Sequence, residues 1–197
     1  MATTETSGEN WWARNAGRLK TIFRLILGLV WTINGTLKFT SGYNGTFLSN
    51  VQASQSNAPG WLQGWYSFWV TQATNHTNLI VSTVGTLEIL LGVALLLGLL
   101  RKIAYLAGMA LSLLIWAVPE GFGAPYGPGS GATDIGTGAI YAVAFLGLVV
   151  INSTYGPSRW SLDHVIERVF PRWASLAEFG GMRALPAPPA HASAPAG

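Results

Sequence analysis

The chain has 197 residues, half of them hydrophobic and only a tenth charged, with 24 glycines and a formal net charge of +3. This composition is typical of membrane helices that pack through small residues, and it does not indicate nucleic-acid binding. Because the chain has no cysteine, disulfides, thiol catalysis, iron–sulfur clusters and thiolate metal sites are excluded.

Four apolar segments follow one another along the chain, at residues 22–39, 79–100, 103–118 and 135–151. A helix needs about 20 apolar residues to cross a bilayer, so the third segment is short. We predict an all-α integral membrane protein whose residues 19–156 form a four-helix bundle after a cytoplasmic segment at 1–18.

The positions of lysine and arginine predict how the bundle is oriented. Basic residues precede the first segment, link the second to the third and follow the fourth, and such clusters stay on the cytoplasmic side. Lys38, at the exit of the first segment, is the exception. Both termini are therefore expected in the cytoplasm. The clusters are Arg14, Arg18, Lys20 and Arg24, then Arg101 and Lys102, and finally Arg159, Arg168 and Arg172.

Glu88 lies near the middle of the second apolar segment, where a carboxyl group is costly and marks a candidate site. Gly85 and Gly92 share its helical face, so a neighbouring helix can approach closely there. Two interpretations stay open. Glu88 either fixes helix register, held neutral or hydrogen-bonded to Asn34 or a tyrosine, or takes part in chemistry.

Residues 40–78 form a long connection on the side opposite the basic clusters. Its aromatic residues Trp61, Trp65, Phe68 and Trp69 have helical spacing, and such density is typical of the membrane interface. The segment is either a helix on the bilayer surface or a lid over a lipophilic ligand between the spans.

A second outer loop, residues 116–136, is rich in glycine and proline and carries Trp116, Glu120 and Asp134. Asp134 is well placed to cap the fourth helix, whereas no structural role is evident for Glu120. In a bundle with its polar faces inward, Asn34 and Tyr141 lie in the core with Glu88. The outer mouth then holds Lys38, Glu120 and Asp134.

The C-terminal region divides into two parts. Residues 157–179 interleave apolar and charged side chains, which predicts an amphipathic helix on the cytoplasmic membrane surface. Residues 180–197 are dominated by alanine and proline and are predicted to be disordered.

Three stretches of sequence resemble the DoxX-like membrane protein family over residues 18–152. RLILGLVWTINGTLK, ending at Lys38, resembles the first helix of the family, and GTLEILLGVALLLG, which contains Glu88, resembles its second. The loop WAVPEGFGAPYGPG, followed by TDIG, is more specific. It resembles the DoxD-type small subunit of thiosulfate:quinone oxidoreductase.

The resemblance implies a multi-pass protein of the bacterial or archaeal cytoplasmic membrane. Acting with a partner subunit, it would pass electrons from thiosulfate to a membrane quinone and form tetrathionate. Lys38, Glu88, Glu120 and Asp134 match the polar positions and are the candidate catalytic residues. Candidates for binding the quinone are Tyr141, Trp116 and Asn34.

The residues fit one half of this reaction better than the other. Carboxyl groups and a tyrosine can deliver protons to a quinone, the diffusible electron acceptor. Thiosulfate is a dianion, yet the outer side offers only Lys38, His76 and backbone amides, so a partner protein is expected to complete its site. No metal or haem site is predicted, because His76 alone is expected to be an exposed loop residue.

Two other functions stay open. The protein is either a non-catalytic accessory subunit of a larger energy-converting membrane complex, or a small transporter or channel. The missing redox centre favours the former, whereas the lack of broken helices disfavours the latter.

Overall fold

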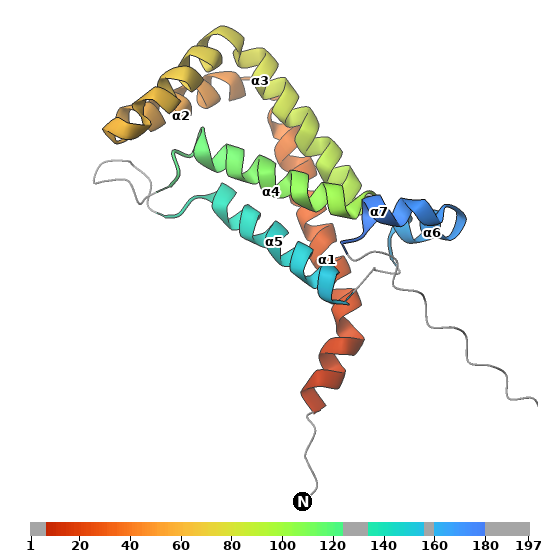
Figure 1. The fold of residues 1–197 in the computed structure, drawn as a ribbon. Coiled ribbons are helices and arrows are strands. Elements are labelled where there is room, and N and C mark those ends of the chain that lie inside the picture. Colours follow the sequence, from red (N-terminus) through yellow and green to blue (C-terminus); the bar gives the residue numbers. More distant parts are fainter. Residues whose placement is uncertain (1–6, 124–133, 156–159, 180–197) are drawn as a thin grey trace, which may run out of the picture.

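The computed structural model describes residues 7–123, 134–155 and 160–179 (Figure 1). The predicted disordered tail, 180–197, and the middle of the second outer loop, 124–133, lie outside the described residues. Every regular element in the described ranges is a helix, so the prediction of an all-α chain is confirmed.

The described ranges contain seven α-helices and two short 3₁₀ turns. They are α1 (Ser7–Leu37), α2 (Tyr43–Asn57), η1 (Gly60–Leu62), α3 (Gln63–Leu97), α4 (Arg101–Ala117), α5 (Thr137–Tyr155), α6 (Leu162–Val169), η3 (Pro171–Trp173) and α7 (Ala174–Ala177). Two stretches, Gly60–Leu97 and Thr137–Thr154, are long and apolar enough to cross a membrane. Because α1 runs without interruption from Ser7, the predicted boundary after residue 18 is not a break in structure.

Four helices pack around one apolar core. The second half of α3 lies along α1, α4 lies along α5, and α5 also contacts α1 (Figure 1). Each helix contributes two buried residues, so the core joins all four. The core residues are Leu27 and Trp31 from α1, Leu91 and Leu95 from α3, Ala104 and Tyr105 from α4, and Phe145 and Leu148 from α5.

The contact between α1 and α3 depends on glycine. A Cβ atom on Gly35 would lie 2.7 Å from the Gly85 carbonyl oxygen, and one on Gly92 would lie 2.6 Å from the Thr32 nitrogen. Both distances are too short for real side chains. The glycine face predicted around Glu88 is therefore confirmed as the surface on which another helix approaches closely.

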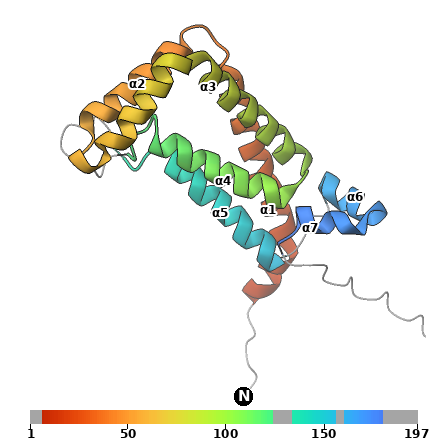
Figure 2. The ribbon, with the colours of Figure 1, turned by 45° about the horizontal axis from the view of Figure 1, so that its top comes forward.

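A helical hairpin occupies residues 43–76. It consists of α2 and the first part of α3, which bends at His76, where φ is −134° and ψ is 28° (Figure 2). The predicted aromatic helix is one arm of this hairpin. Trp65 Nε1 and Tyr66 OH both donate to the Ala117 carbonyl, at 3.2 and 3.1 Å, so the arm reaches the end of α4. This contact fits the lid interpretation.

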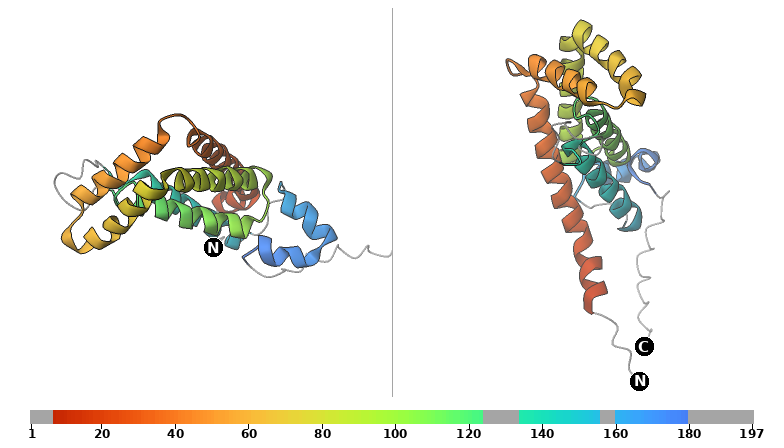
Figure 3. Two further views of the ribbon diagram at one scale, coloured as in Figure 1. Left: turned by 90° about the horizontal axis from the view of Figure 1, so that it is seen from above. Right: turned by 90° about the vertical axis from the view of Figure 1, so that its left-hand side faces the viewer.

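The C-terminal segment is not the single amphipathic helix that the sequence predicts. It folds into α6, η3 and α7, which lie beside the turn between α3 and α4 (Figure 3). The helix is interrupted at Pro171, which cannot continue the hydrogen bonding of α6. Asp163 is completely buried, so the segment is attached to the other helices through its polar residues.

Candidate functional site

Lys38 and Glu88 form an ion pair inside the protein. Lys38 follows the last residue of α1, and its Nζ lies 3.1 Å from Glu88 Oε2 on α3. Glu88 is 2% exposed. The ammonium group also donates to the Tyr43 hydroxyl at 2.9 Å and lies 4.8 Å from the centre of that ring. The sequence placed Asn34 beside Glu88, but the partner is Lys38.

Close helix packing brings the two charges together. A Cβ atom on Gly85 would lie 3.1 Å from Lys38 Cβ, so the glycine makes room for the lysine one turn before Glu88. Lys38 therefore reaches back along α3 into the interior, instead of extending to an outer mouth. A buried charge needs such a partner, because desolvation otherwise costs several kcal/mol.

An apolar pocket adjoins this ion pair. Its volume is about 60 Å³, and Lys38 and Tyr43 line its polar end. The Nε1 group of Trp69 is buried without a hydrogen-bond partner among the described residues, so a lining residue has a donor to spare. The remaining lining residues are Phe47, Ile80, Val81, Val84, Leu111, Leu114, Ile115, Val118 and Pro119.

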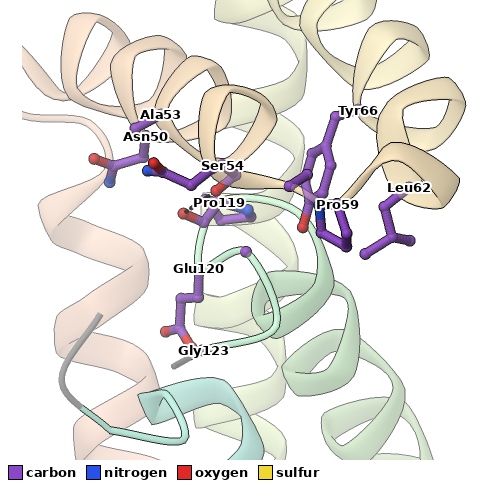
Figure 4. Close-up of a pocket in the computed structure, with 12 residues that line it drawn as sticks. Asn50, Ala53, Ser54, Pro59, Leu62, Tyr66, Pro119, Glu120 and Gly123 are labelled. Carbon is purple, nitrogen blue, oxygen red and sulfur yellow. Dashed lines mark hydrogen bonds between the residues drawn. The ribbon is translucent and has the colours of Figure 1, made fainter. Parts of the chain in front are cut away.

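A second pocket, of about 180 Å³, lies between the hairpin and the loop after α4 (Figure 4). Asn50, Ser54 and Asn57 line it from α2, together with Tyr66 and the loop residues 119–121 and 123. Its described lining contains neither lysine nor arginine. In Figure 4 the Glu120 side chain, which lines the pocket, points away from α2.

The Glu120 carboxylate instead caps α5. Its Oε2 accepts a hydrogen bond from the Gly138 amide at 2.8 Å, in the first turn of that helix. Asp134, the predicted cap, accepts from the Gly136 amide at 2.8 Å, just before the helix, and is exposed. Trp116 Nε1 donates to the Ile135 carbonyl at 2.7 Å. These three side chains together fix the start of α5.

The predicted site residues thus fall into separate groups. Lys38 and Glu88 share the inner ion pair, while Glu120, Asp134 and Trp116 gather where α5 begins. Tyr141 packs in the core with its ring 5.9 Å from Trp31. Asn34 lies partly buried on α1.

Sequence reasoning missed a buried charge cluster around Arg101. This side chain is 1% exposed and pairs with the carboxylates of Asp163 (3.0 Å), Glu167 (3.2 Å) and Glu178. Asp163 also accepts from the Leu100 and Arg101 amides and thereby caps α4. The acids at 163, 167 and 178 were visible in the sequence, but nothing there linked them to Arg101.

Other polar groups extend this cluster. Asn152 accepts a hydrogen bond from Lys20 and donates one to Glu178, both at 3.1 Å. Arg24 donates to the Trp160 carbonyl at 2.9 Å. Burial raises the pKa of Glu178 and of Glu167, although Arg101 opposes the rise in both. The cluster joins α1, α4 and α5 to the C-terminal segment.

The described residues contain no group of three or more histidine and acidic side chains that could hold a metal ion. His76 is exposed at the bend of α3. No family model, curated protein or solved structure matches this chain.

Proposed function

We propose that the protein is the membrane subunit of a quinone-linked oxidoreductase, of the thiosulfate:quinone type that its DoxD-like loop resembles. The observation that supports this most is the Lys38–Glu88 ion pair, whose lysine lines an apolar pocket while its carboxylate lies behind the lysine. A quinone head group has this character, with an apolar ring and two carbonyl oxygens that need donors.

The pocket supplies groups for each part of quinone reduction. Lys38, Tyr43 and Trp69 offer N–H or O–H donors to the carbonyl oxygens, and Glu88 can pass on protons. The quinone takes up two electrons and two protons to become a quinol. The two electrons come from two thiosulfate ions, which join through a new S–S bond as tetrathionate.

Entry of the ring requires the hairpin to move. The pocket, of about 60 Å³, is small for a quinone ring. Phe47 and Trp69, which close it, both belong to the hairpin. The hairpin therefore serves as a lid, and its exposed Trp61 and Phe68 side chains suit the membrane interface.

Thiosulfate oxidation is assigned to a partner protein. The second pocket faces the outer end, but its described lining offers a dianion neither lysine nor arginine. Because no cysteine is present, an iron–sulfur electron-transfer centre would also have to come from the partner. The partner would dock on the outer side, above the loop that contains Glu120.

We place the four packed helices across the bacterial or archaeal cytoplasmic membrane, with both termini inside. The two stretches that are long and apolar enough support this, and α1 and α4 would cross beside them. Lys20, Arg24 and Arg101 lie at one end of the packed helices, as the positive-inside rule requires.

Quinone binding can be measured on the protein alone. A short-chain quinone would be titrated calorimetrically into the protein in lipid nanodiscs. Val84→Trp should fill the pocket and abolish binding. Val93 lies on the same helix and its side chain is 40% exposed, so Val93→Trp should leave binding unchanged. Absence of quinone binding by the folded wild-type protein would overturn the proposal.

A non-catalytic accessory subunit is the second candidate. It is favoured by the structural roles of Glu120, Asp134 and Trp116, which all hold the start of α5. In this case Glu88→Gln should alter assembly with the larger complex and leave turnover of the intact complex unchanged. In the first candidate, the same change lowers the rate of quinone reduction in a complex that still assembles.

A further inference from the structure

The turn between α6 and η3 exposes five residues in succession: Arg168, Val169, Phe170, Pro171 and Arg172. We call this turn the α6–η3 tip. Its two large apolar side chains, Val169 and Phe170, are 68% and 65% exposed. In Figure 1 and in the left view of Figure 3, α6 projects away from the four packed helices. The tip is therefore available to a surface outside this chain.

The charge at the tip differs from the charge of the segment as a whole. Residues 160–179 contain three acidic and two basic residues, a formal charge of −1. All three acids pair with Arg101, which comes from outside the segment. The two arginines, Arg168 and Arg172, are exposed. The folding of the segment thus turns its negative charge inward and leaves a positive, apolar tip.

We propose that the α6–η3 tip binds acidic phospholipids of the inner leaflet. Val169 and Phe170 insert between the head groups, and Arg168 and Arg172 bond to phosphate oxygens. This rests on the membrane placement given under Proposed function, which sets this end of the helices at the negatively charged leaflet.

Charge and size favour lipid over a protein partner. Two apolar side chains between two arginines complement an acidic head-group layer, whereas a stable protein interface needs about 800 Å² on each side. Lys102, at the start of α4, donates to the Ser175 carbonyl and adds a further cation at the same end of the molecule. The tip thus shares its end of the molecule with a third cation.

The buried charge cluster around Arg101 holds the tip in its shape before any lipid binds. Asp163 bonds to two backbone amides and to the Arg101 side chain, and Trp173 Nε1 donates to Asp163 at 2.9 Å. These contacts hold residues on both sides of the turn. An interfacial helix usually folds as it binds and loses conformational entropy in doing so. This tip is already folded, so its binding does not carry that cost.

The test uses the absence of cysteine in the chain. Val169→Cys creates one labelling position for an environment-sensitive fluorophore. The full-length protein would be placed in nanodiscs of phosphatidylcholine, with or without phosphatidylglycerol and nitroxide-labelled lipid. We expect blue-shifted emission and strong nitroxide quenching with phosphatidylglycerol, and weaker effects without it. A label at Asn75, exposed in the hairpin, should not respond to acidic lipid.

Two double variants separate charge from fold. Arg168→Gln with Arg172→Gln should abolish the dependence on acidic lipid, lowering the ratio of inserted to free tip about fivefold for each arginine. Arg168→Lys with Arg172→Lys should preserve it. Two results would overturn the proposal. In one, the label stays in water in both lipid compositions, as expected if the tip binds a protein instead. In the other, its emission shifts equally in both compositions. Quinone titration of the same nanodiscs reports on the pocket independently.

Discussion

Lys38 and Glu88 neutralise each other across the interface of α1 and α3, with Nζ 3.1 Å from Oε2 and the carboxylate 2% exposed. The pair has a structural role and, in the proposed function, a chemical one. It lets two charges remain in the interior, and it places a proton donor beside an apolar pocket. Separating the two roles requires variants that keep the fold.

Removing one charge should cost more than removing both. Lys38→Met leaves a buried carboxylate without its partner, so we expect a loss of about 3–5 kcal/mol in the free energy of unfolding. Lys38→Met combined with Glu88→Leu should cost clearly less, because no unpaired charge remains. Unfolding of the purified protein in detergent, arranged as a double-mutant cycle, measures both values. Additive losses would show that the charges do not stabilise each other.

The glycines between α1 and α3 give a second prediction. Gly92→Ala would place a Cβ atom 2.6 Å from the Thr32 nitrogen, so the helices must separate and the protein should lose about 1–3 kcal/mol. Gly64 has no atom within 4 Å of the added carbon. Gly64→Ala should therefore be neutral, or stabilise by about 0.5–1 kcal/mol through helix propensity. Thermal unfolding of the two variants provides the comparison, and equal losses would contradict it.

The two caps near α5 should differ in strength. Glu120→Ala removes a partly buried acceptor from the Gly138 amide, and we expect a loss of about 1–2 kcal/mol. Glu120→Gln keeps an acceptor oxygen and should lose less. Asp134→Ala removes an exposed bond and should cost a few tenths of a kcal/mol. A larger effect at Asp134 than at Glu120, in the same unfolding assay, would reverse the assignment of the main cap.

Particular residues show what the sequence could and could not predict. Glu88 and its glycine face followed from helical spacing alone, because Gly85, Glu88 and Gly92 lie within two turns of one helix. The partner of Glu88 did not follow, since the side chain of Lys38 is long enough to turn inward from the helix end. Arg101 and Asp163 are 62 residues apart, and spacing gives no information about such a pair. The sequence therefore identified an intrahelical face but missed contacts made between elements.

The second outer loop shows the same limit. Its glycines and prolines predict a turn, but the sequence indicates no structural role for Glu120, because the amide it caps lies 18 residues further along. Helix caps usually lie just before the helix, so the sequence favours Asp134 as the cap.

Glu178 should make the attachment of the C-terminal segment depend on pH. Burial raises its pKa above the ordinary 4.5, so the folded protein binds this proton more tightly than the unfolded chain. The stabilisation is complete below about pH 4.5 and is lost as the pH rises through the folded-state pKa. Wild type should therefore lose stability relative to Glu178→Gln as the pH increases.

Unfolding midpoints of wild type and Glu178→Gln over this pH range measure the difference. Glu167→Gln is the matched control. Burial also raises the pKa of Glu167, but this variant keeps the Glu178 carboxyl, so it should still lose stability as the pH rises. A difference that grows in favour of wild type as the pH rises would have the wrong sign.

Arg101 should be the residue on which the C-terminal segment depends most. Arg101→Met leaves Asp163 and Glu178 buried without their cation, so we expect a loss of about 3–5 kcal/mol at neutral pH. Arg101→Lys should recover little of this stability, because one ammonium group cannot reproduce guanidinium bonds to three carboxylates.

Limited proteolysis measures the attachment of the segment. In Arg101→Met the segment from Trp160 to Phe179 should be cleaved by trypsin at Arg168 or Arg172. Lys102→Met, which removes the neighbouring cation and only an exposed bond to the Ser175 carbonyl, should leave the segment resistant. Equal resistance of wild type and Arg101→Met would mean that apolar contacts, and not this cluster, hold the segment in place.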